Sequence, residues 1–321
     1  MMSEFSAASY IREIGRGKHG ARSLSQDDAA RLYEAMLTRQ ISDLELGAVL
    51  LAMRIKGESA AELAGFMQAA HAQTQVFALP DGAEYAPVLI PSYNGARKKI
   101  NLTPLLAGLL AQRGVPVLVH GVKQDKGRVS SAEIFRELTW PCIQKADEFS
   151  VCHKQAKPAF IAIDDLAPNL AGLLRLRAIL GVRNSTHTVV KLLQVFAGPA
   201  LRLFSYTHPE YLQLMREFLP LHLNPNLGEV LVMRATEGEV VINVERAQQI
   251  ERFHSQGVEL LAAKQSQMAE ADLGLPDSID ATSSAEWMQA VMQGRIAVPE
   301  NLQIQLELCQ QQARRLRQLS Q

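Results

Sequence analysis

The distribution of apolar residues changes near Pro80, and this change limits the folds that the chain can adopt. Before it, apolar residues recur every three or four positions between helix start and stop signals, which predicts consecutive amphipathic helices. After it, short apolar runs alternate with helical stretches, a pattern typical of a largely parallel sheet covered on both faces. We therefore expect an α/β protein. A small all-helical domain would span residues 1–80, with a helical contribution from about 165–195, and a larger α/β domain with a mostly parallel central sheet would span 81–321.

Capping boxes indicate where the first helices begin. In such a box a Ser side chain and a Glu side chain three residues later satisfy backbone N–H groups that the helix leaves free. Ser42 with Glu45 and Ser59 with Glu62 have this spacing, and Gly57 between them is a natural helix stop. The apolar spacing after Ser42 predicts one buried helix face, made of Leu44, Ala48, Leu51, Ala52 and Ile55.

Further elements are expected along the rest of the chain. The apolar runs that predict strands are 88–90, 115–120, 160–163, 200–206 and 230–233. Helices should begin at Ser25, Thr103, Ser131, Pro168, Thr186 and Pro209, and Gly181 should end one of them. A last capping box, Ser283 with Glu286, predicts a helix toward Gly294, and a Gln- and Arg-rich helix should fill 300–321.

The composition excludes several classes of protein. With 47% apolar and 21% charged residues, the chain is neither disordered nor of low complexity. Its longest apolar stretch, 104–120, is interrupted by Gln112 and Arg113 and is shorter than a membrane span of about 20 residues, and the first residues lack an apolar secretory core. The three cysteines fit neither a disulfide framework nor a zinc site. We expect a cytoplasmic protein that does not associate with membranes.

Charge is segregated along the chain although the total is balanced at 33 Lys and Arg against 33 Asp and Glu. Residues 90–206 carry 16 basic and 7 acidic side chains, a formal charge of +9, whereas the parts before and after carry −3 and −6. A basic middle third indicates an anionic ligand of some size, either a phosphorylated metabolite or a nucleic-acid backbone. Scattered, solvated lysines are the alternative interpretation.

The N-terminal region holds the first candidate cluster. Glycines separate its cations, so backbone amides could approach an anion that the cations neutralise. No strand precedes it, which argues against a nucleotide-binding glycine loop. We favour a mobile basic loop between the first two helices that contacts a polyanion, over a plain solvated loop. Its basic residues are Arg12, Arg16, Lys18, His19 and Arg22.

Two further clusters follow neighbouring predicted strands, where the carboxyl edge of a sheet and helix N-termini bind ligands in α/β folds. They should form one basic rim, although basic surface turns would look the same. The first is Asn94, Gly95, Arg97, Lys98 and Lys99, and the second is His120, Gly121, Lys123, Lys126, Gly127 and Arg128. Ser130 and Ser131 then open a helix and offer hydroxyl groups to phosphate.

Other residues carry weaker signals. Arg175, Arg177 and Arg183 lie near a helix end, where the helix dipole also favours cations. Glu237 and Glu239 flank Gly238 between two predicted strands. They could be a carboxylate pair that binds a metal, and a hairpin turn explains them equally well. Phe5, Tyr10 and Tyr93 could stack on unpaired bases, or could belong to the core. Short signatures of common enzyme classes are absent.

The order of these motifs resembles the anthranilate phosphoribosyltransferases and the related pyrimidine nucleoside phosphorylases. Residues 44–66 are similar to the family's Arg-x-Lys-Gly-Glu helical segment, and Asn101-Leu102-Thr103 is similar to its Asn-Ile-Ser-Thr. His120-Gly121 resembles Lys-His-Gly, Ser131-Ala132-Glu133 resembles Ser-Ala-Asp, and 177–183 resembles the Arg-rich segment that lines the acceptor site. The resemblance covers most of the chain and implies the phosphoribosyltransferase fold.

The chain departs from this pattern where the family holds its donor substrate. Residues 91–98 replace the Gly-Thr-Gly-Gly-Asp loop that holds pyrophosphate, which exchanges small residues for bulk and positive charge. Val119 replaces the Lys of Lys-His-Gly, and Pro104 replaces the last Thr of Asn-Ile-Ser-Thr. The magnesium-binding Asp-Glu pair is reduced to Glu237-Gly238-Glu239. These replacements argue against anthranilate chemistry.

This combination resembles the divergent TrpD-like group, whose members keep the transferase fold but bind nucleic acids. The resemblance implies a homodimer that associates through the helical domain, with basic grooves across it. We therefore predict a non-enzymatic protein that binds single- or double-stranded DNA, or RNA, through backbone phosphates and largely independently of sequence. The predicted contacts are Arg12, Arg16, Lys18, Arg22, Arg97, Lys98, Lys99, Lys123, Lys126, Arg128, Arg175, Arg177 and Arg183.

The remnant of the active site would comprise Asn94, Gly95, Asn101, Thr103, His120, Gly121, Ser131 and Glu239. No catalytic residue, metal ligand or cofactor is expected on this interpretation. The alternative is an active phosphoribosyltransferase that uses phosphoribosyl pyrophosphate and Mg²⁺ with an unknown acceptor. A third hypothesis is a scaffold whose acidic C-terminal third recruits a basic protein partner.

Overall fold

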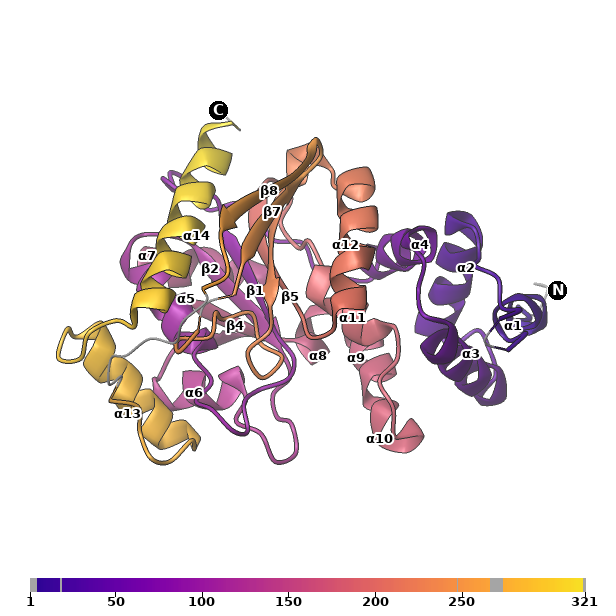
Figure 1. Ribbon diagram of the computed structural model, residues 1–321, viewed down its shortest axis with the longest axis horizontal. Helices are drawn as coiled ribbons and strands as arrows, with labels where there is room; N and C mark the ends of the chain where they lie inside the picture. The colour runs from indigo at the N-terminus through magenta and orange to yellow at the C-terminus, as the bar shows by residue number, and fades with distance from the viewer. Residues whose placement is uncertain (1–4, 18, 247, 266–273, 320–321) are drawn as a thin grey trace.

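The computed structural model describes residues 5–17, 19–246, 248–265 and 274–319. A helical domain lies at one end of the molecule, and an α/β domain with one central sheet makes up the rest (Figure 1). The helices are α1 (Ala8–Ile14), α2 (Gln26–Leu37), α3 (Asp43–Lys56), α4 (Ala60–His71), α5 (Thr103–Gln112), α6 (Ser131–Glu137), α7 (Phe149–Lys154), α8 (Ile163–Leu166), α9 (Pro168–Arg175), α10 (Arg177–Leu180), α11 (Thr186–Leu192), α12 (Pro209–His222), α13 (Ala281–Met292) and α14 (Glu300–Gln318).

The sheet has eight described strands in the order β3-β4-β2-β1-β5-β6-β7-β8. They are β1 (Val88–Ser92), β2 (Val117–Gly121), β3 (Cys142–Ile143), β4 (Ala159–Ala162), β5 (Ala200–Tyr206), β6 (Gly228–Arg234), β7 (Ile250–His254) and β8 (Gly257–Ala262). The first six in this order run parallel, and β7 and β8 are antiparallel. The α/β architecture with a mostly parallel sheet is therefore confirmed, and the five predicted strands are all present.

Alternation along each strand sends apolar side chains to both faces of the sheet. On β1, Leu89 belongs to a core shared with the helical domain, whereas Val88 and Ile90 belong to a second core with α5 and α14. A strand buried on both faces needs apolar side chains at nearly every position. This requirement explains why uninterrupted apolar runs marked the central strands.

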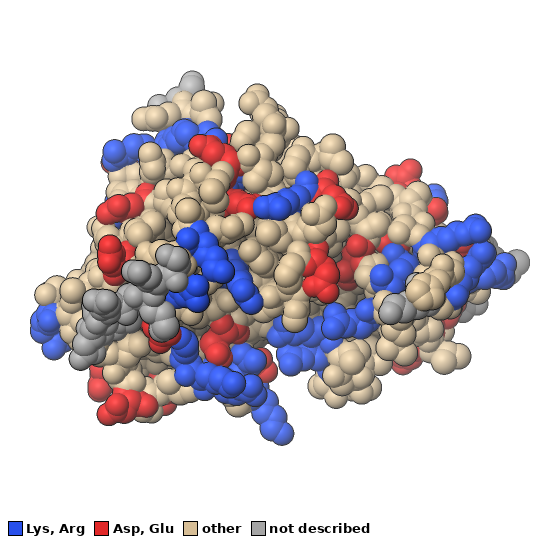
Figure 2. All heavy atoms as spheres, viewed as in Figure 1, with Lys and Arg blue, Asp and Glu red and all other residues tan. Residues whose placement is uncertain are grey.

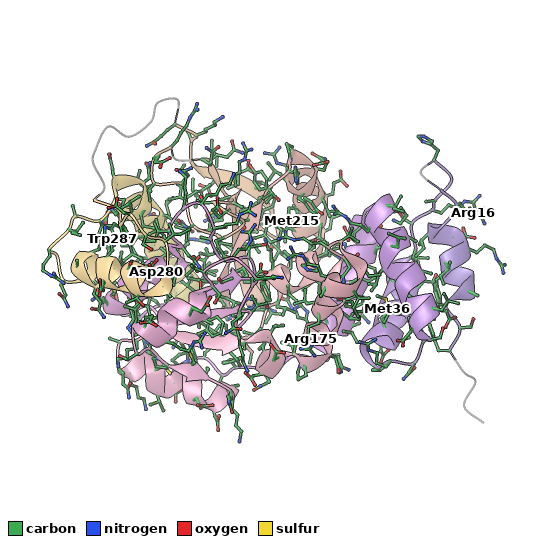
Figure 3. The ribbon with its side chains drawn as sticks, turned by 90° about the horizontal axis from the view of Figure 1, so that it is seen from below. Arg16, Met36, Arg175, Met215, Asp280 and Trp287 are labelled. Carbon is green, nitrogen blue, oxygen red and sulfur yellow. The ribbon has the colours of Figure 1, made fainter. Side chains whose placement is uncertain are left out.

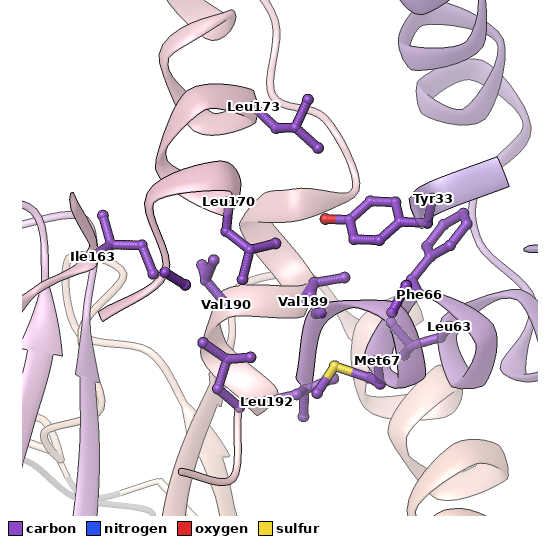
Figure 4. Close-up of a cluster of buried hydrophobic side chains, with 14 of the residues drawn as sticks. Tyr33, Leu63, Phe66, Met67, Ile163, Leu170, Leu173, Val189, Val190 and Leu192 are labelled. Atoms are coloured by element: carbon purple, nitrogen blue, oxygen red, sulfur yellow. The ribbon is translucent and has the colours of Figure 1, made fainter. Parts of the chain in front are cut away.

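An aromatic and aliphatic cluster joins the helical domain to the rest of the molecule (Figure 4). Tyr33 of α2 stacks on Phe66 of α4 with ring centroids 4.7 Å apart, and its hydroxyl donates a hydrogen bond of 2.8 Å to Thr186. Leu170 of α9 and Val189 of α11 are fully buried in the same core. The apolar faces of α9 and α11 thus fix the helical domain beside the sheet.

The first two capping boxes form as predicted, but the predicted buried face of α3 is wrong. Ser42 and Ser59 cap α3 and α4 reciprocally with their Glu partners, and Gly57 ends α3. On α3, however, Leu44, Leu51 and Ile55 are 84%, 48% and 63% exposed. The buried residues are Leu46, Val49, Leu50 and Met53. The helix has two apolar stripes, and its neighbours cover only the second.

The predicted capping box of α13 is also wrong. The N-cap is Asp280, whose carboxylate accepts a hydrogen bond of 2.8 Å from the backbone of Ser283, so the helix begins two residues before the predicted Ser283. An Asp side chain caps as well as a Ser side chain, and here it lies one turn earlier. The predicted starts of α2, α5, α6, α9, α11 and α12 agree with the structure.

None of the helices in the described part of the chain combines the length and the apolar character needed to cross a membrane.

Candidate functional site

Two loops meet at the carboxyl edge of the sheet. The β1–α5 loop (93–102) follows β1, and the β2–α6 loop (122–130) follows β2. Ala96 and Val129 exchange backbone hydrogen bonds of 3.0 and 2.8 Å, so the two loops are paired like short strands. Because β1 and β2 are adjacent and parallel, the predicted clusters do lie on one rim.

A carboxylate of the chain itself occupies the backbone amides of the β1–α5 loop. Oε1 of Glu239 accepts hydrogen bonds of 2.8 Å from the N–H groups of both Asn94 and Gly95. Its Oε2 accepts from the hydroxyl of Thr103, the first residue of α5, at 3.3 Å. Glu239 is only 3% exposed. Converging amides beside a helix N-terminus form a typical anion site, and here the bound anion is Glu239.

The neighbouring residues of the same turn complete this arrangement. Glu237 accepts from the N–H groups of Arg97 and Lys98 at 3.1 and 3.2 Å. Gly238 has a φ of +96°, and a Cβ there would lie 2.7 Å from Cγ of Asn94, so only glycine fits between the two glutamates. The turn spanning 237–239 therefore supplies two carboxylates to four loop amides.

The other polar residues predicted for the remnant site are also internally hydrogen-bonded. Asn101 donates to Ser131 Oγ at 3.2 Å, and Ser131 Oγ lies 2.7 Å from the hydroxyl of Ser92. Ser130 caps α6 through Glu133. The hydroxyl groups that were predicted to face phosphate thus have partners within the protein. In this structure the helix cap and the loop packing use them.

His120 and Gly121 belong to β2 itself and not to the exposed rim. His120 is fully buried, and its Nδ1 lies 2.7 Å from the hydroxyl of Tyr93. Tyr93 is 7% exposed and belongs to the core, which agrees with the second of the two interpretations offered for it. The strand continues one residue past the predicted run and ends at Gly121, so the His120 side chain lies within the buried strand.

The predicted basic residues divide into those with and those without a carboxylate partner. Paired cations are Lys99 with Glu245, Lys123 with Asp165, Arg128 and Arg177 with Asp125, and Arg175 with Asp164. Within the described residues, Arg12, Arg97, Lys98, Lys126 and Arg183 form no ion pair within 4.0 Å. Figure 2 shows Lys and Arg gathered over the helical end and along the lower middle of this face.

The N-terminal cluster lies apart from the rim. Arg12 belongs to α1 and not to the following loop, which corrects its predicted place, and Lys18 lies outside the described residues. Arg16 and Arg22 both approach Glu13, at 2.7 and 3.8 Å. Figure 3 shows Arg16 at the outer end of the helical domain, whereas Arg175 lies on α9 nearer the sheet.

Sequence reasoning named Arg183 but missed that it begins a row of cationic and imidazole groups, which continues along α11 with His187 and Lys191. Arg183, His187 and Lys191 are spaced by four residues, which places them on one side of a helix. Lys191 donates to the carbonyl of Gly238 at 3.2 Å, and Arg183 donates to the side chain of Asn94. The four-residue spacing was visible in the sequence. The row therefore lies against the turn that holds Glu239.

Buried histidines predict a loss of stability in mild acid. Burial lowers the pKa of His71 and His187 to about 4 and that of His120 to about 3. Because the unfolded pKa is near 6.5, the unfolded chain binds protons first as the pH falls below that value. Each histidine then costs up to about 1.4 kcal/mol per pH unit.

We expect the free energy of unfolding, measured with urea, to fall by several kcal/mol from pH 7 to pH 5. A His208→Gln variant, changed at an exposed histidine, should show the same fall. Equal stability at the two pH values would contradict the burial argument.

Within the part of the chain that the structure describes, no three His, Cys, Asp or Glu side chains gather in a way that could hold a metal ion. Glu237 and Glu239, the predicted carboxylate pair, form the turn that the alternative interpretation expected.

Comparison with known proteins places this geometry in a family. Residues 8–73 match the glycosyl transferase family, helical bundle domain. The uncharacterized protein YbiB of Escherichia coli (strain K12) is 42% identical over 300 residues, which cover 93% of this chain and 92% of YbiB. The chain belongs to the TrpD-like family.

The chain is also similar to anthranilate phosphoribosyltransferases. Anthranilate phosphoribosyltransferase of Dictyoglomus thermophilum is 29% identical over 143 residues, or 44% of this chain and 40% of that protein. The Saccharomyces cerevisiae enzyme, solved in complex with PRPP and Mg, superposes with a TM-score of 0.72 at 14% identity, covering 95% of this chain and 86% of that one. These likenesses establish the phosphoribosyltransferase scaffold, which the sequence motifs had predicted.

Proposed function

We propose that this TrpD-like protein binds nucleic acids through backbone phosphates, largely independently of base sequence, and does not transfer phosphoribosyl groups. The observation that carries the proposal is the set of contacts made by the backbone amides and the basic side chains of the β1–α5 loop. Its backbone amides are occupied by Glu237 and Glu239, while the side chains of Arg97 and Lys98 are exposed and unpaired. The loop presents its positive charge outward, and the amides of Asn94, Gly95, Arg97 and Lys98 already have carboxylate acceptors and are not open to a buried pyrophosphate.

The shape of the rim supports an extended ligand. Arg97, Lys126 and Arg128 line one hollow of about 560 Å³ between the two paired loops. Arg97 and Lys126 are exposed and unpaired within the described part of the chain, whereas Arg128 is half-buried and pairs with Asp125 of the same hollow. Exposed cations neutralise phosphates, and they carry no information on base identity. A single-stranded or double-stranded backbone could follow such a rim, and the proposal covers DNA and RNA.

The proposed lack of transferase activity follows from the negative charge of Glu239 at the β1–α5 loop. Pyrophosphate would have to displace the Glu239 carboxylate or lie beside it, and like charges in a buried place repel strongly. Mg²⁺ would be needed only to accompany a pyrophosphate that had displaced Glu239. We therefore propose that the protein functions without a cofactor.

Sequence independence can be tested by fluorescence anisotropy with labelled strands of equal length and different base order. We expect dissociation constants within about threefold for single-stranded DNA of scrambled sequences, because phosphate contacts dominate. A preference of a hundredfold or more for one sequence would show that base edges are read, and would contradict this part of the proposal.

We also propose that two copies associate through the helical domain. Leu44, Ala48, Leu51 and Ile55 form an unburied apolar stripe along α3, and such a face is typical of a protein interface. A second copy could cover it with the same stripe, as two-fold symmetry requires. The dimer would bring two basic rims into one assembly.

A charge placed in the stripe should break the dimer. Leu51→Glu is expected to convert the wild-type dimer into a monomer, because the carboxylate would be desolvated at the interface. The mass is measured by light scattering after size exclusion. Leu221→Glu, at an exposed leucine of α12, is the matched control and should leave the mass unchanged. A dimeric Leu51→Glu protein would exclude this stripe as the interface.

A further inference from the structure

A cleft of about 600 Å³ lies between the helical domain and the sheet. One wall is the α3–α4 turn, with Arg54, and the other walls are α11, the end of β5 and the first turns of α12. Figure 1 shows α11 and α12 between the sheet and α4. The volume lies within the range of about 300–1,000 Å³ that is usual for small-molecule sites. The cleft can therefore hold a ligand of the size of one nucleotide.

Three of the four Lys and Arg side chains that line the cleft lack a carboxylate partner within the described part of the chain, and the fourth, Lys56, pairs with Glu62 at 2.6 Å. Among the described residues, Arg54, Arg183 and Lys191 form no ion pair within 4.0 Å. Arg183 and Lys191 are linked through Asn94, which accepts from Arg183 and donates to the Gly238 carbonyl that Lys191 also contacts. The two half-buried cations repel each other because both are bound to the same small group, Asn94 and the Gly238 carbonyl. A bound anion would relieve that repulsion.

The positive charge is concentrated at one end of the cleft. The pKa of Lys191 is lowered to about 8, mainly by burial, and the charge of Arg183 lowers it further. Glu58 and Glu210 also line the cleft, and among the described residues neither forms an ion pair within 4.0 Å with Arg183, His187 or Lys191. The charges that act on Arg183 and Lys191 include Asp125 and Glu239, which are already bonded elsewhere. An anion would therefore bind at the Arg183 and Lys191 end.

The remaining walls offer flat rings. Tyr206 and Tyr211 are partly exposed in the cleft, and the hydroxyl of Tyr211 accepts a hydrogen bond of 3.5 Å from Arg54. Phe204 and Leu214 add apolar surface. Aromatic rings beside cations are the combination that holds a nucleobase and its phosphate together.

We propose that this cleft binds a nucleoside phosphate monoester, as a free nucleotide or as the phosphorylated end of a strand. The inference rests on the proposed function for the strand-end case. A phosphate monoester carries about −1.5 to −2 charges at neutral pH, whereas each phosphodiester in a strand carries −1. A site with several unpaired cations therefore favours the monoester over the interior of a strand.

The test uses the full-length protein and two single-stranded DNA 12-mers of the same sequence, one with a 5′-phosphate and one with a 5′-hydroxyl. We expect the phosphorylated strand to bind about tenfold more tightly. Adenosine 5′-monophosphate should bind in calorimetry, and adenosine or inorganic phosphate should bind at least tenfold more weakly. The double variant Arg183→Gln with Lys191→Met should lose the preference for the phosphate and keep the affinity for the hydroxyl-ended strand.

Arg183 and Lys191 donate hydrogen bonds to Asn94 and Gly238, so the double variant also removes these contacts. Arg54 is exposed, and the second variant, Arg54→Ala, leaves both hydrogen bonds intact. It should reduce the preference about threefold or more. Equal affinity for both strand ends, with no binding of the nucleotide, would overturn the inference even if both strands bind. If the nucleotide binds and neither strand does, the cleft is a site for free nucleotides, and the proposed function is wrong. If nothing binds, both are wrong.

Discussion

Replacing Glu239 by Ala is expected to lower the free energy of unfolding by about 2–4 kcal/mol. The substitution leaves two buried N–H groups, of Asn94 and Gly95, without an acceptor, and each unsatisfied buried donor costs about 1–3 kcal/mol. The change is measured by urea denaturation at neutral pH. A variant within about 0.5 kcal/mol of the wild type would show that the carboxylate does not hold the loop.

The matched control is Glu237→Ala in the same turn. Glu237 accepts from the N–H groups of Arg97 and Lys98, which are exposed residues, so water can replace it at a cost below about 1 kcal/mol. Inorganic phosphate should also stabilise Glu239→Ala and have little effect on the wild type, because only in the variant are the amides of Asn94 and Gly95 vacant. Equal stabilisation of both proteins would place the phosphate elsewhere.

The triple variant Arg97→Ala, Lys98→Ala and Lys126→Ala is expected to weaken nucleic-acid binding on the order of a hundredfold near 0.1 M salt. Each lost phosphate contact removes about 0.9 from the slope of log affinity against log salt, so the slope should become shallower by about three. The measurement is anisotropy of a labelled single strand at several salt concentrations.

Its control removes the same amount of charge from cations that already have carboxylate partners. Lys99→Ala, Lys123→Ala and Arg175→Ala remove three residues that pair with Glu245, Asp165 and Asp164. This control should lose less than about tenfold in affinity and change the slope by less than one. Equal losses in the two triple variants would show that net charge alone, and not the free rim, decides binding.

Local signals in the sequence predicted much of the fold. Strands such as β1 and β5, which are buried on both faces, are apolar at most positions, and the capping boxes at Ser42 and Ser59 act within one turn. By contrast, β7 and β8 carry charged residues such as Glu251, Arg252 and Glu259, and β8 is half-exposed, so no apolar run marked them.

The errors came from choices that depend on distant parts of the chain. Periodicity showed an apolar stripe on α3, but it could not show which of two stripes the other helices cover. The sequence placed Asn94, Gly95 and Glu239 in one remnant site, but their hydrogen bonds join residues about 145 positions apart. The ion pairs that neutralise Lys99 and Lys123 have the same long-range origin. Candidate residues were therefore predictable by type, and their availability to a ligand was not.

The central claim is tested most directly by salt-dependent binding in the presence of a competing donor substrate. Labelled single-stranded DNA, duplex DNA and RNA are titrated with the purified protein by anisotropy between 50 and 200 mM salt, with and without phosphoribosyl pyrophosphate and Mg²⁺. If six or more phosphates are contacted, affinity should fall by roughly 10³ or more over this range, and the competitor should have no effect. Weak, salt-insensitive binding, or displacement of the strand by phosphoribosyl pyrophosphate, would contradict the proposed function and favour a surviving transferase.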